Sequence, residues 1–212
     1  MPDVSNKALL GEVATYYTEK LRLHGDTPQG VDWNGVESQT RRFTELSRIF
    51  TSVRGFSVND LGCGYGAFYD YLVDHHDDVR YLGIDVSEDM VKAATQRVTA
   101  NPNVRFLCGD APDLTGDFGV ASGIFNVRLG RSDAEWKNHL HASLDILNRT
   151  SSKGFAFNCL TSYSDAEKMQ SHLYYADPGE VFDHCKRTYS RHVALLHDYG
   201  LYEFTVLVRK QA

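Results

Sequence analysis

Three carboxylates stand at the ends of three short apolar runs in the first half of the chain. Asp60 closes a run near residues 56–60, Asp85 follows a second run near 80–84, and Asp110 follows a third near 104–108. Ligands of open α/β sheets bind beyond the carboxyl ends of the parallel strands. Acids at those ends can accept hydrogen bonds from hydroxyl, amino or ammonium groups. The spacing therefore indicates a site for a polar, nucleotide-like ligand.

A glycine-rich turn follows the first of these acids. Asp60 stands two residues before Gly62, and Gly64 and Gly66 follow it. Glycine allows unusual backbone angles and a close approach of ligand to main chain, and a helix after the turn presents its positive N-terminus. A dinucleotide would place its pyrophosphate on this turn, where Asp60 repels it. The same carboxylate attracts the ammonium group of S-adenosylmethionine (SAM), which has no phosphate, so the electrostatics favour SAM over NAD.

The segment DLGCGYG, residues 60–66, resembles the first motif of the class I SAM-dependent methyltransferases. It also fits the dinucleotide fingerprint G-x-G-x-x-G/A through Gly62, Gly64 and Ala67. An NAD(P)-dependent oxidoreductase is therefore one alternative, and a SAM-binding subunit without catalysis is another. The resemblance covers residues 56–212 and implies an enzyme that transfers a methyl group from SAM to an acceptor.

The acids and loops around the turn supply the other cofactor contacts. Asp85 lies 23 residues beyond Gly62, where an acid at a strand end can accept ribose hydroxyls, although it can also simply cap the next helix. The resemblance implies that Asp110 receives the adenine amino group and that Ala111 faces a ring nitrogen. Arg42 is either a partner for the SAM carboxylate or a solvated arginine. The predicted cofactor-binding residues are Asp60, Gly62, Cys63, Gly64, Asp85, Val86, Asp110, Ala111, Ser122 and Arg42.

Apolar runs alternate with helical patterns from residue 56 onward, as in a parallel sheet covered by helices on both faces. Strands are predicted near 56–60, 80–84, 104–108, 118–123 and 153–159, and helices near 66–75, 87–100 and 133–148. Residues 192–199 and 202–209 predict two further strands joined by a tight turn at Gly200. The predicted fold is α/β: a three-layer, doubly wound, seven-stranded sheet, mostly parallel with a C-terminal antiparallel hairpin, plus N-terminal helices.

Two amphipathic helices, near 7–23 and 37–50, precede this pattern. A linker at residues 24–34, which contains glycine and proline, separates them. The resemblance implies that such N-terminal helices form a lid over SAM and the acceptor. We therefore divide the chain into a helical lid, residues 1–55, and a SAM-binding domain, residues 56–212.

The methyl acceptor should lie against the loops after the fourth and fifth strands. Residues 121–126 read ASGIFN, which departs from the Asn-Pro-Pro-Tyr pattern of methyltransferases that act on nucleic-acid bases or glutamine side chains. This departure favours a small-molecule acceptor. Residues 161–188 form an aromatic and polar insert suited to acceptor recognition, although its tyrosines can also simply cover the core. The candidate substrate-binding residues are Trp33, which either closes the site or pins the two N-terminal helices together, with Asn126, Tyr163, Tyr175 and His184.

Composition restricts the partners and the location. The net charge of −6, with scattered basic residues, argues against nucleic acid. No apolar stretch is long enough to span a bilayer and the N-terminus lacks the pattern of a signal peptide, so a cytoplasmic location is expected. The four cysteines show no C-x-x-C pair, and the adjacent His184 and Cys185 are too few ligands for a structural metal site. No side chain is singled out as catalytic, because alignment of the acceptor with SAM can carry much of the rate.

Overall fold

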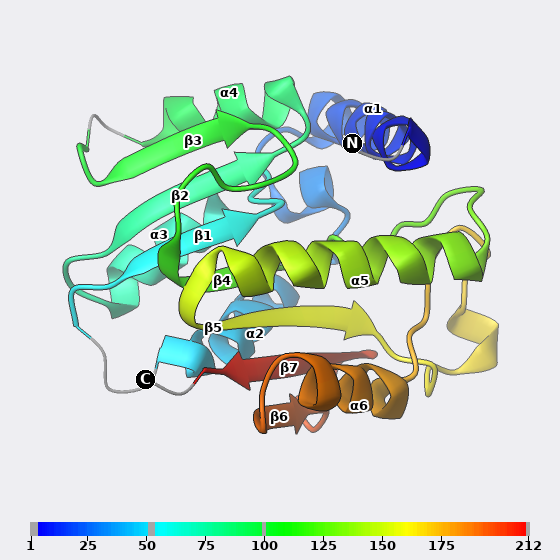
Figure 1. Cartoon of the computed structure of the whole chain (residues 1–212). Coiled ribbons are helices and arrows are strands. Elements are labelled where there is room, and N and C mark those ends of the chain that lie inside the picture. The colour runs from blue at the N-terminus through cyan, green and yellow to red at the C-terminus, as the bar shows by residue number, and fades with distance from the viewer. Residues whose placement is uncertain (1–3, 51–53, 99–100, 211–212) are drawn as a thin grey trace.

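The computed structural model describes residues 4–50, 54–98 and 101–210, with side chains from residue 7 onward. A seven-stranded sheet in the order β3-β2-β1-β4-β5-β7-β6 forms its centre (Figure 1). The strands are β1 Ser57–Leu61, β2 Arg80–Asp85, β3 Val104–Cys108, β4 Gly116–Ala121, β5 Ser151–Leu160, β6 His192–Leu196 and β7 Glu203–Arg209. The helices are α1 Val4–His24, α2 Val36–Ser47, α3 Ala67–His75, α4 Glu88–Arg97, α5 Asp133–Arg149 and α6 Pro178–Thr188, with short 3₁₀ turns η1 Pro28–Val31, η2 Arg48–Phe50 and η3 Ala166–Lys168.

The sheet is parallel from β3 to β5, and only β7 runs antiparallel to both of its neighbours, β5 and β6. The central strands are buried on both faces because helices cover them: all residues of β7 except Arg209 are buried, as are Val58 to Leu61 in β1. Such continuous apolar runs are typical of strands covered on both sides. The predicted fold class is confirmed.

Two apolar clusters fill the space between the sheet and its helices. On one face, Leu140 and Leu144 of α5 and Cys185 of α6 pack against Phe155 and Val206 of the sheet. Figure 1 shows α5 and α6 in front of the sheet, with α2 and α3 behind it. On that far face, the second cluster joins the buried residues of α2, η2 and α3 to β1, β4 and β5: Phe43, Leu46, Phe50, Phe68, Leu72, Val58, Val120 and Ala156.

The two N-terminal helices are attached to the core in different ways. Leu9 is the one buried side chain of α1 among those described. By contrast, α2 buries Gln39, Arg42, Phe43 and Leu46. The division at residue 55 therefore does not separate a surface layer from a core, because α2 is part of the core and α1 is not. Residues 1–3, 51–53 and 211–212 of the two predicted units lie outside the described residues.

The structure corrects three details of the predicted elements. Residues 178–188 form helix α6 within the aromatic and polar insert, for which no helix was predicted. Asp177 caps this helix by accepting from the backbone N–H of Glu180, and Pro178 occupies its first turn. The link between β6 and β7 is six residues long, 197–202, and not a tight turn. The helix predicted over 87–100 ends at Arg97, and residues 99–100 lie outside the described residues.

Candidate active site

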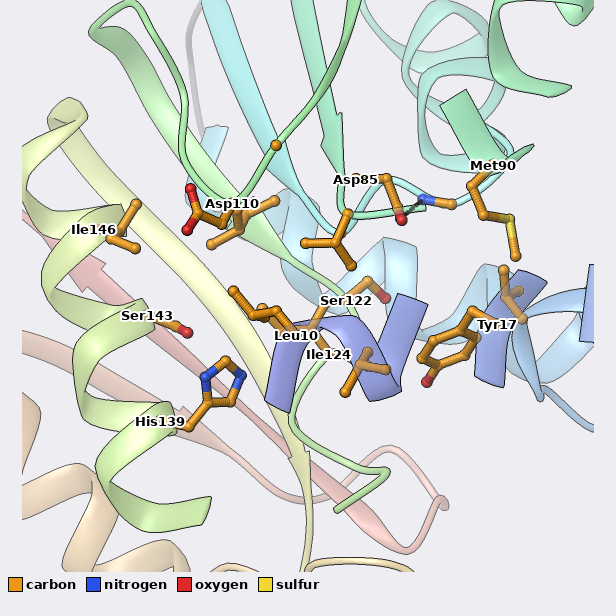
Figure 2. Close-up of a pocket in the computed structure, with 18 of the residues that line it drawn as sticks. Leu10, Tyr17, Asp85, Met90, Asp110, Ser122, Ile124, His139, Ser143 and Ile146 are labelled. Carbon is orange, nitrogen blue, oxygen red and sulfur yellow. Dashed lines mark hydrogen bonds between the residues drawn. The ribbon is translucent and has the colours of Figure 1, made fainter. Parts of the chain in front are cut away.

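A cavity opens at the carboxyl ends of β1, β2, β3 and β4. We call it the first cavity. Helix α1 covers it, and α5 forms one wall (Figure 2). Its lining residues are Leu10, Val13, Tyr17, Val31, Trp33, Leu61, Gly62, Gly64, Asp85, Val86, Met90, Gly109, Asp110, Ser122, Gly123, Ile124, His139, Ala142, Ser143 and Ile146. The loops after four parallel strands thus meet in one place, as the three acids predicted.

The glycine turn permits close packing that a side chain would prevent. Gly62 and Gly64 both have positive φ, 77° and 54°. A Cβ atom on Gly62 would lie 2.1 Å from Cγ2 of Ile124, and one on Gly64 would lie 2.9 Å from Cγ1 of Val31. The loop after β4 and the N-terminal segment therefore close directly over this turn, and glycine is what allows them to do so.

Asp85 binds the turn to the start of α4. Its Oδ2 accepts the backbone N–H of Gly64 at 2.9 Å (Figure 2). Its Oδ1 accepts the backbone N–H of Ser87 at 2.9 Å. Burial raises the pKa of this carboxyl, while the hydrogen bonds from Ser87 and Gly64 oppose the rise. Ser87 caps α4 by accepting from the backbone N–H of Met90. The side chain that caps α4 is thus that of Ser87, and Asp85 holds the backbone of this cap. The ribose contact of Asp85 stays a prediction, for which the carboxylate retains acceptor capacity because it has about four acceptor positions and these bonds use two.

Asp60 is buried at the end of β1 with half of its carboxylate unused. The hydroxyl of Tyr81 donates to its Oδ2, while its Oδ1 is buried with no hydrogen-bond partner among the described residues. Burial raises the pKa of Asp60 to about 7; the hydrogen bond from Tyr81 lowers it and the charge of Asp85 adds to the rise. A buried carboxylate oxygen without a donor is costly, so it indicates a place for a cation or a hydrogen-bond donor.

A separate small cavity is lined by Asp60. We call it the third cavity, and the second cavity is described below. Asp60, Cys63 and Ser122 line it together with Trp33 and Gln39. The hydroxyl of Ser122 is a second buried polar atom without a partner among the described residues. The third cavity therefore brings together two polar groups that need partners, one from the end of β1 and one from the loop after β4.

Helix α5 contributes a wall that the sequence analysis missed. His139, Ser143 and Ile146 stand at positions i, i+4 and i+7 and point into the first cavity (Figure 2). Burial lowers the pKa of His139 to about 4, so its ring is neutral at pH 7. The i, i+4, i+7 spacing shows in the sequence that these three residues share one face of a helix. The sequence does not show which part of the molecule that face packs against.

A larger second cavity adjoins the first beyond the end of β5. Tyr17, Val31, Trp33 and Gly123 line both cavities and form their shared wall. The other residues that line the second cavity are Tyr16, Lys20, Asp32, Asn34, Arg42, Asn126, Val127, Leu160, Ser164, Lys168, Gln170, His172, Leu173, Tyr175, Gly200, Leu201, Tyr202 and Glu203. Burial raises the pKa of Tyr16 to about 12, and the hydrogen bond to Asp32 adds to the rise. Three predicted substrate residues, Trp33, Asn126 and Tyr175, therefore meet in this cavity.

The remaining predicted residues are placed as follows. Val86 and Asp110 line the first cavity, whereas Ala111 lies beside it and is not part of its lining. Arg42 lines the second cavity and neither of the others. Tyr163 is 74% exposed and lines none of these three cavities. His184 lies on α6 and stacks on His141 of α5 at 3.9 Å between ring centroids, in a groove that shares no residue with the site.

No group of three or more His, Cys, Asp or Glu side chains suited to holding a metal ion occurs within residues 4–50, 54–98 and 101–210. In the same ranges, no helix is long and apolar enough to cross a membrane.

Comparison with known proteins agrees with this geometry. A family model described as "Methyltransferase domain" matches residues 58–149. The protein named "Putative methyltransferase Rv1506c" of Mycobacterium tuberculosis (strain H37Rv) is 59% identical over 163 residues, which are 77% of this chain and 98% of that protein. A tRNA (guanine-N(7)-)-methyltransferase of Streptococcus sanguinis is 31% identical over 103 residues, 48% of this chain and 45% of its own length.

Solved structures of low sequence identity share the fold. Magnesium protoporphyrin IX methyltransferase from Synechocystis PCC 6803, with bound SAM, aligns over 99% of both chains with a TM-score of 0.62 at 16% identity. The N-methyltransferase NodS from Bradyrhizobium japonicum, in complex with S-adenosylhomocysteine (SAH), aligns over 94% of this chain and 98% of its own with a TM-score of 0.66 at 18% identity.

The sheet order and the glycine turn define an α/β protein that binds a nucleoside cofactor at its strand ends. With the 59% identical relative, they show that the chain belongs to the class I SAM-dependent methyltransferases. The oxidoreductase and non-catalytic alternatives are therefore set aside. The residues present fit SAM, because the buried oxygens of Asp60 and Ser122 lack partners among the described residues and Gly62 and Gly64 line the first cavity.

Proposed function

We propose that this methyltransferase transfers the methyl group of SAM to a small-molecule acceptor held in the second cavity. The observation that carries the proposal is the wall shared by the two cavities, made of Tyr17, Val31, Trp33 and Gly123. A methyl donor in the first cavity and an acceptor in the second would meet at this wall. SAM supplies the electrophilic methyl group, and the chain supplies position and exclusion of water.

The cofactor roles follow from where each side chain lies. In this proposal Asp60, with Gly62, Cys63, Gly64 and Ser122, surrounds the amino-acid end of SAM, and the ammonium group becomes the missing partner of the Asp60 carboxylate. Asp85 and Val86 face the ribose. Asp110 reaches the adenine from the loop after β3, with Ala111 next to it in the chain. His139, Ser143 and Ile146 of α5 form the wall opposite Asp85 and limit the depth of the adenosine site (Figure 2).

The acceptor is proposed to be small because the second cavity is lined by the lid segment as well as by the sheet loops. Tyr16, Tyr17 and Lys20 of α1 form part of its lining, and a polymer would have to displace that helix. The net charge of −6 does not favour a nucleic acid. All four cysteines are free thiols, which is usual in a reducing cytoplasm, so a cytoplasmic location is part of the same proposal.

The part of the proposal that concerns the cofactor is tested by thermal unfolding with added ligand. SAM and SAH should raise the melting temperature of the protein, and NADH and NADPH should not. The acceptor half is tested with methyl-tritiated SAM and two kinds of probe: a panel of phenols, anilines and aromatic acids, and bulk tRNA. Label in one or more small molecules supports the proposal. Label in tRNA alone would overturn the small-molecule acceptor and leave the methyltransferase intact.

A further inference from the structure

We propose that the second cavity selects an aromatic acceptor that carries one carboxylate, and that Arg42 anchors this carboxylate through its free Nη1. The inference rests on the proposed function, since it names the class of acceptor for that site. It makes Arg42 a residue of the acceptor site, where the sequence had suggested contact with the SAM carboxylate.

The first observation is an unused donor on a buried cation. The Arg42 side chain is 7% exposed, and its Nε and Nη2 donate to Glu203 at 2.8 and 2.6 Å. Its Nη1 is buried with no hydrogen-bond partner among the described residues. A buried charged donor left without a partner is destabilising, and most such groups in proteins are satisfied by protein, water or ligand. Arg42 lines the second cavity, which makes a ligand in that cavity a candidate partner for Nη1.

The second observation is that Arg42 cannot turn to satisfy Nη1 elsewhere. Glu203 accepts two bonds from Arg42 and a third from Nδ2 of Asn158 at 2.5 Å. Oδ1 of Asn158 in turn accepts the backbone N–H of Gly123 at 2.8 Å. On the other side, the ring of Trp33 lies 3.8 Å from the Arg42 guanidinium carbon. The guanidinium is thus held in one plane, which suits a planar carboxylate better than a spherical or flexible anion.

The third observation is the charge balance of the lining. The cations that line the second cavity are Lys20, Arg42 and Lys168, and the carboxylates are Asp32 and Glu203. Lys20 is paired with Asp32 at 2.7 Å, and Arg42 with Glu203. Lys168 is paired with Asp165, which is not part of the lining, at 3.1 Å, so each of the three cations already has a carboxylate partner. Nη1 of Arg42 is then the buried cationic donor of the lining that has no partner among the described residues.

The fourth observation concerns the body of the acceptor. Five aromatic rings line the second cavity, those of Tyr16, Tyr17, Trp33, Tyr175 and Tyr202. Aromatic rings prefer to pack on one another in offset or edge-to-face arrangements, so they favour a flat, aromatic ligand over an aliphatic one. Trp33 belongs both to this lining and to the wall shared with the first cavity, so a ring packed on it would lie next to the point of methyl transfer.

The test uses the full chain loaded with SAH, with benzoate, 4-hydroxybenzoate and indole-3-carboxylate as probes and the matching carboxamides as neutral controls. Calorimetric titration should show at least one acid binding about tenfold or more tightly than its amide, as expected for a charge-assisted hydrogen bond. Arg42→Lys keeps the charge but has a single nitrogen, which cannot bind Glu203 and also present a separate Nη1 to the ligand, so it should abolish most of this preference. Arg41→Lys, on the exposed side of the same helix, is the matched control and should leave the preference unchanged.

A second measurement distinguishes this inference from the alternative that Arg42 binds the carboxylate of SAM. If Arg42 held the SAM carboxylate, Arg42→Lys would weaken SAH but not 5′-methylthioadenosine, which lacks the amino-acid end. That result would overturn the inference, as would acids and amides that bind equally or not at all to the parent protein. The comparison of acids with amides in the parent protein needs no variant, so it stands even if Arg42→Lys fails to fold. Failure of the parent protein to bind SAH would instead count against the proposed function.

Discussion

Arg42 on α2 and Glu203 on β7 are 161 positions apart in the chain and form a buried, bidentate ion pair. Asn158 extends this pair to the backbone of Gly123, and Trp33 covers its other side. The pair therefore joins the second helix, the antiparallel edge of the sheet and the loop after β4 into one unit beside the proposed point of methyl transfer. Burial of such a pair costs desolvation of both charges, and the hydrogen bonds to Glu203 offset part of that cost, while Nη1 of Arg42 has no partner among the described residues.

Replacing Glu203 with Gln should destabilise the protein by about 3 to 5 kcal/mol, because it leaves the Arg42 charge buried without a counter-ion. Urea unfolding of the two proteins measures the difference. Glu37→Gln is the matched control, since Glu37 pairs with Arg41 on the exposed side of α2 and such a surface pair contributes little. Equal stability of Glu203→Gln and the parent protein would mean that the pair is solvated in solution.

Asp60 should make the ligand-free protein less stable as the pH rises. Its folded-state pKa is about 7, against 3.8 for the free side chain, so the folded state holds a proton that the unfolded state has lost between these values. Stability therefore falls as the pH rises from about 4 to 7, by linkage. Asp60→Asn should remove this part of the decline and give a ligand-free protein more stable than the parent at pH 8. Urea unfolding at a series of pH values measures it, and identical pH profiles would contradict the raised pKa.

The same carboxylate should make cofactor binding depend on pH in the opposite direction. The proposed ammonium contact needs the charged form of Asp60, so the affinity for SAH should rise with pH and level off above about 7. 5′-Methylthioadenosine has no ammonium group and should show no such dependence. Asp60→Asn should weaken SAH and leave 5′-methylthioadenosine unchanged. Equal effects on both ligands would place Asp60 away from the amino-acid end.

Asp85→Asn should weaken SAH and 5′-methylthioadenosine alike, by roughly 1.5 to 3 kcal/mol for the loss of charge-assisted hydrogen bonds. Asn keeps the size of the side chain but turns one acceptor into a donor, which would face the N–H of Gly64 or of Ser87. Calorimetric titration measures both ligands, and Asp113→Asn at an exposed ion pair is the control. An unchanged dissociation constant would show that Asp85 only shapes the turn.

Gly64→Val should prevent tight binding of SAH. The new side chain would adopt a left-handed backbone conformation and its Cβ would start 2.9 Å from Cγ1 of Val31. A double variant, Gly64→Val with Val31→Ala, distinguishes two causes of the lost SAH binding. Recovery of SAH binding in the double variant would mean that closure of the N-terminal segment was blocked, whereas continued loss would mean that the ligand itself was. Tight SAH binding by Gly64→Val alone would remove the turn from the cofactor site.

The central strands and the cofactor turn could be predicted because their signals are local. Asp60, Gly62 and Gly64 lie within five residues, and the turn itself brings them together. Asp85 needed only the regular alternation of strands and helices to be placed beside them. By contrast, α6 was missed because tyrosines and histidines surround its sparse apolar stripe of Pro178, Val181 and Cys185. Its capping residue, Asp177, followed by proline, was the signal that could have found it.

The second cavity could not be assembled from the sequence because its residues come from four separate parts of the chain. Arg42 meets Glu203 only because β7 inserts between β5 and β6. The tight turn predicted at Gly200 gave no indication of that order. His184 was predicted near the acceptor from its place after the fifth strand, but as part of α6 it turns toward α5 and stacks on His141. The rotation of a helix about its axis decides such cases, and it depends on packing partners that a single sequence does not reveal.

The opening segment of the lid should be α1 with η1, and not the whole of residues 1–55. Leu9 is the one buried side chain of α1 among those described, and its other ties to the domain include exposed pairs such as Glu12 with Arg131 and Arg22 with Asp89. Pairs of this kind contribute little, so α1 can detach at low cost. Helix α2 is fixed by Phe43 and Leu46 in the core.

Hydrogen exchange with and without SAH tests this division. Amides of α1 and η1 should exchange fast in the free protein and about tenfold or more slowly with SAH, because closure over the first cavity protects them. Amides of α2, residues 36–47, should be protected in both states and serve as the internal control. Equal protection of α1 in both states would make it permanent structure, and Trp33 would then not close over the acceptor. Fast exchange in α2 as well would restore the larger lid, residues 1–55.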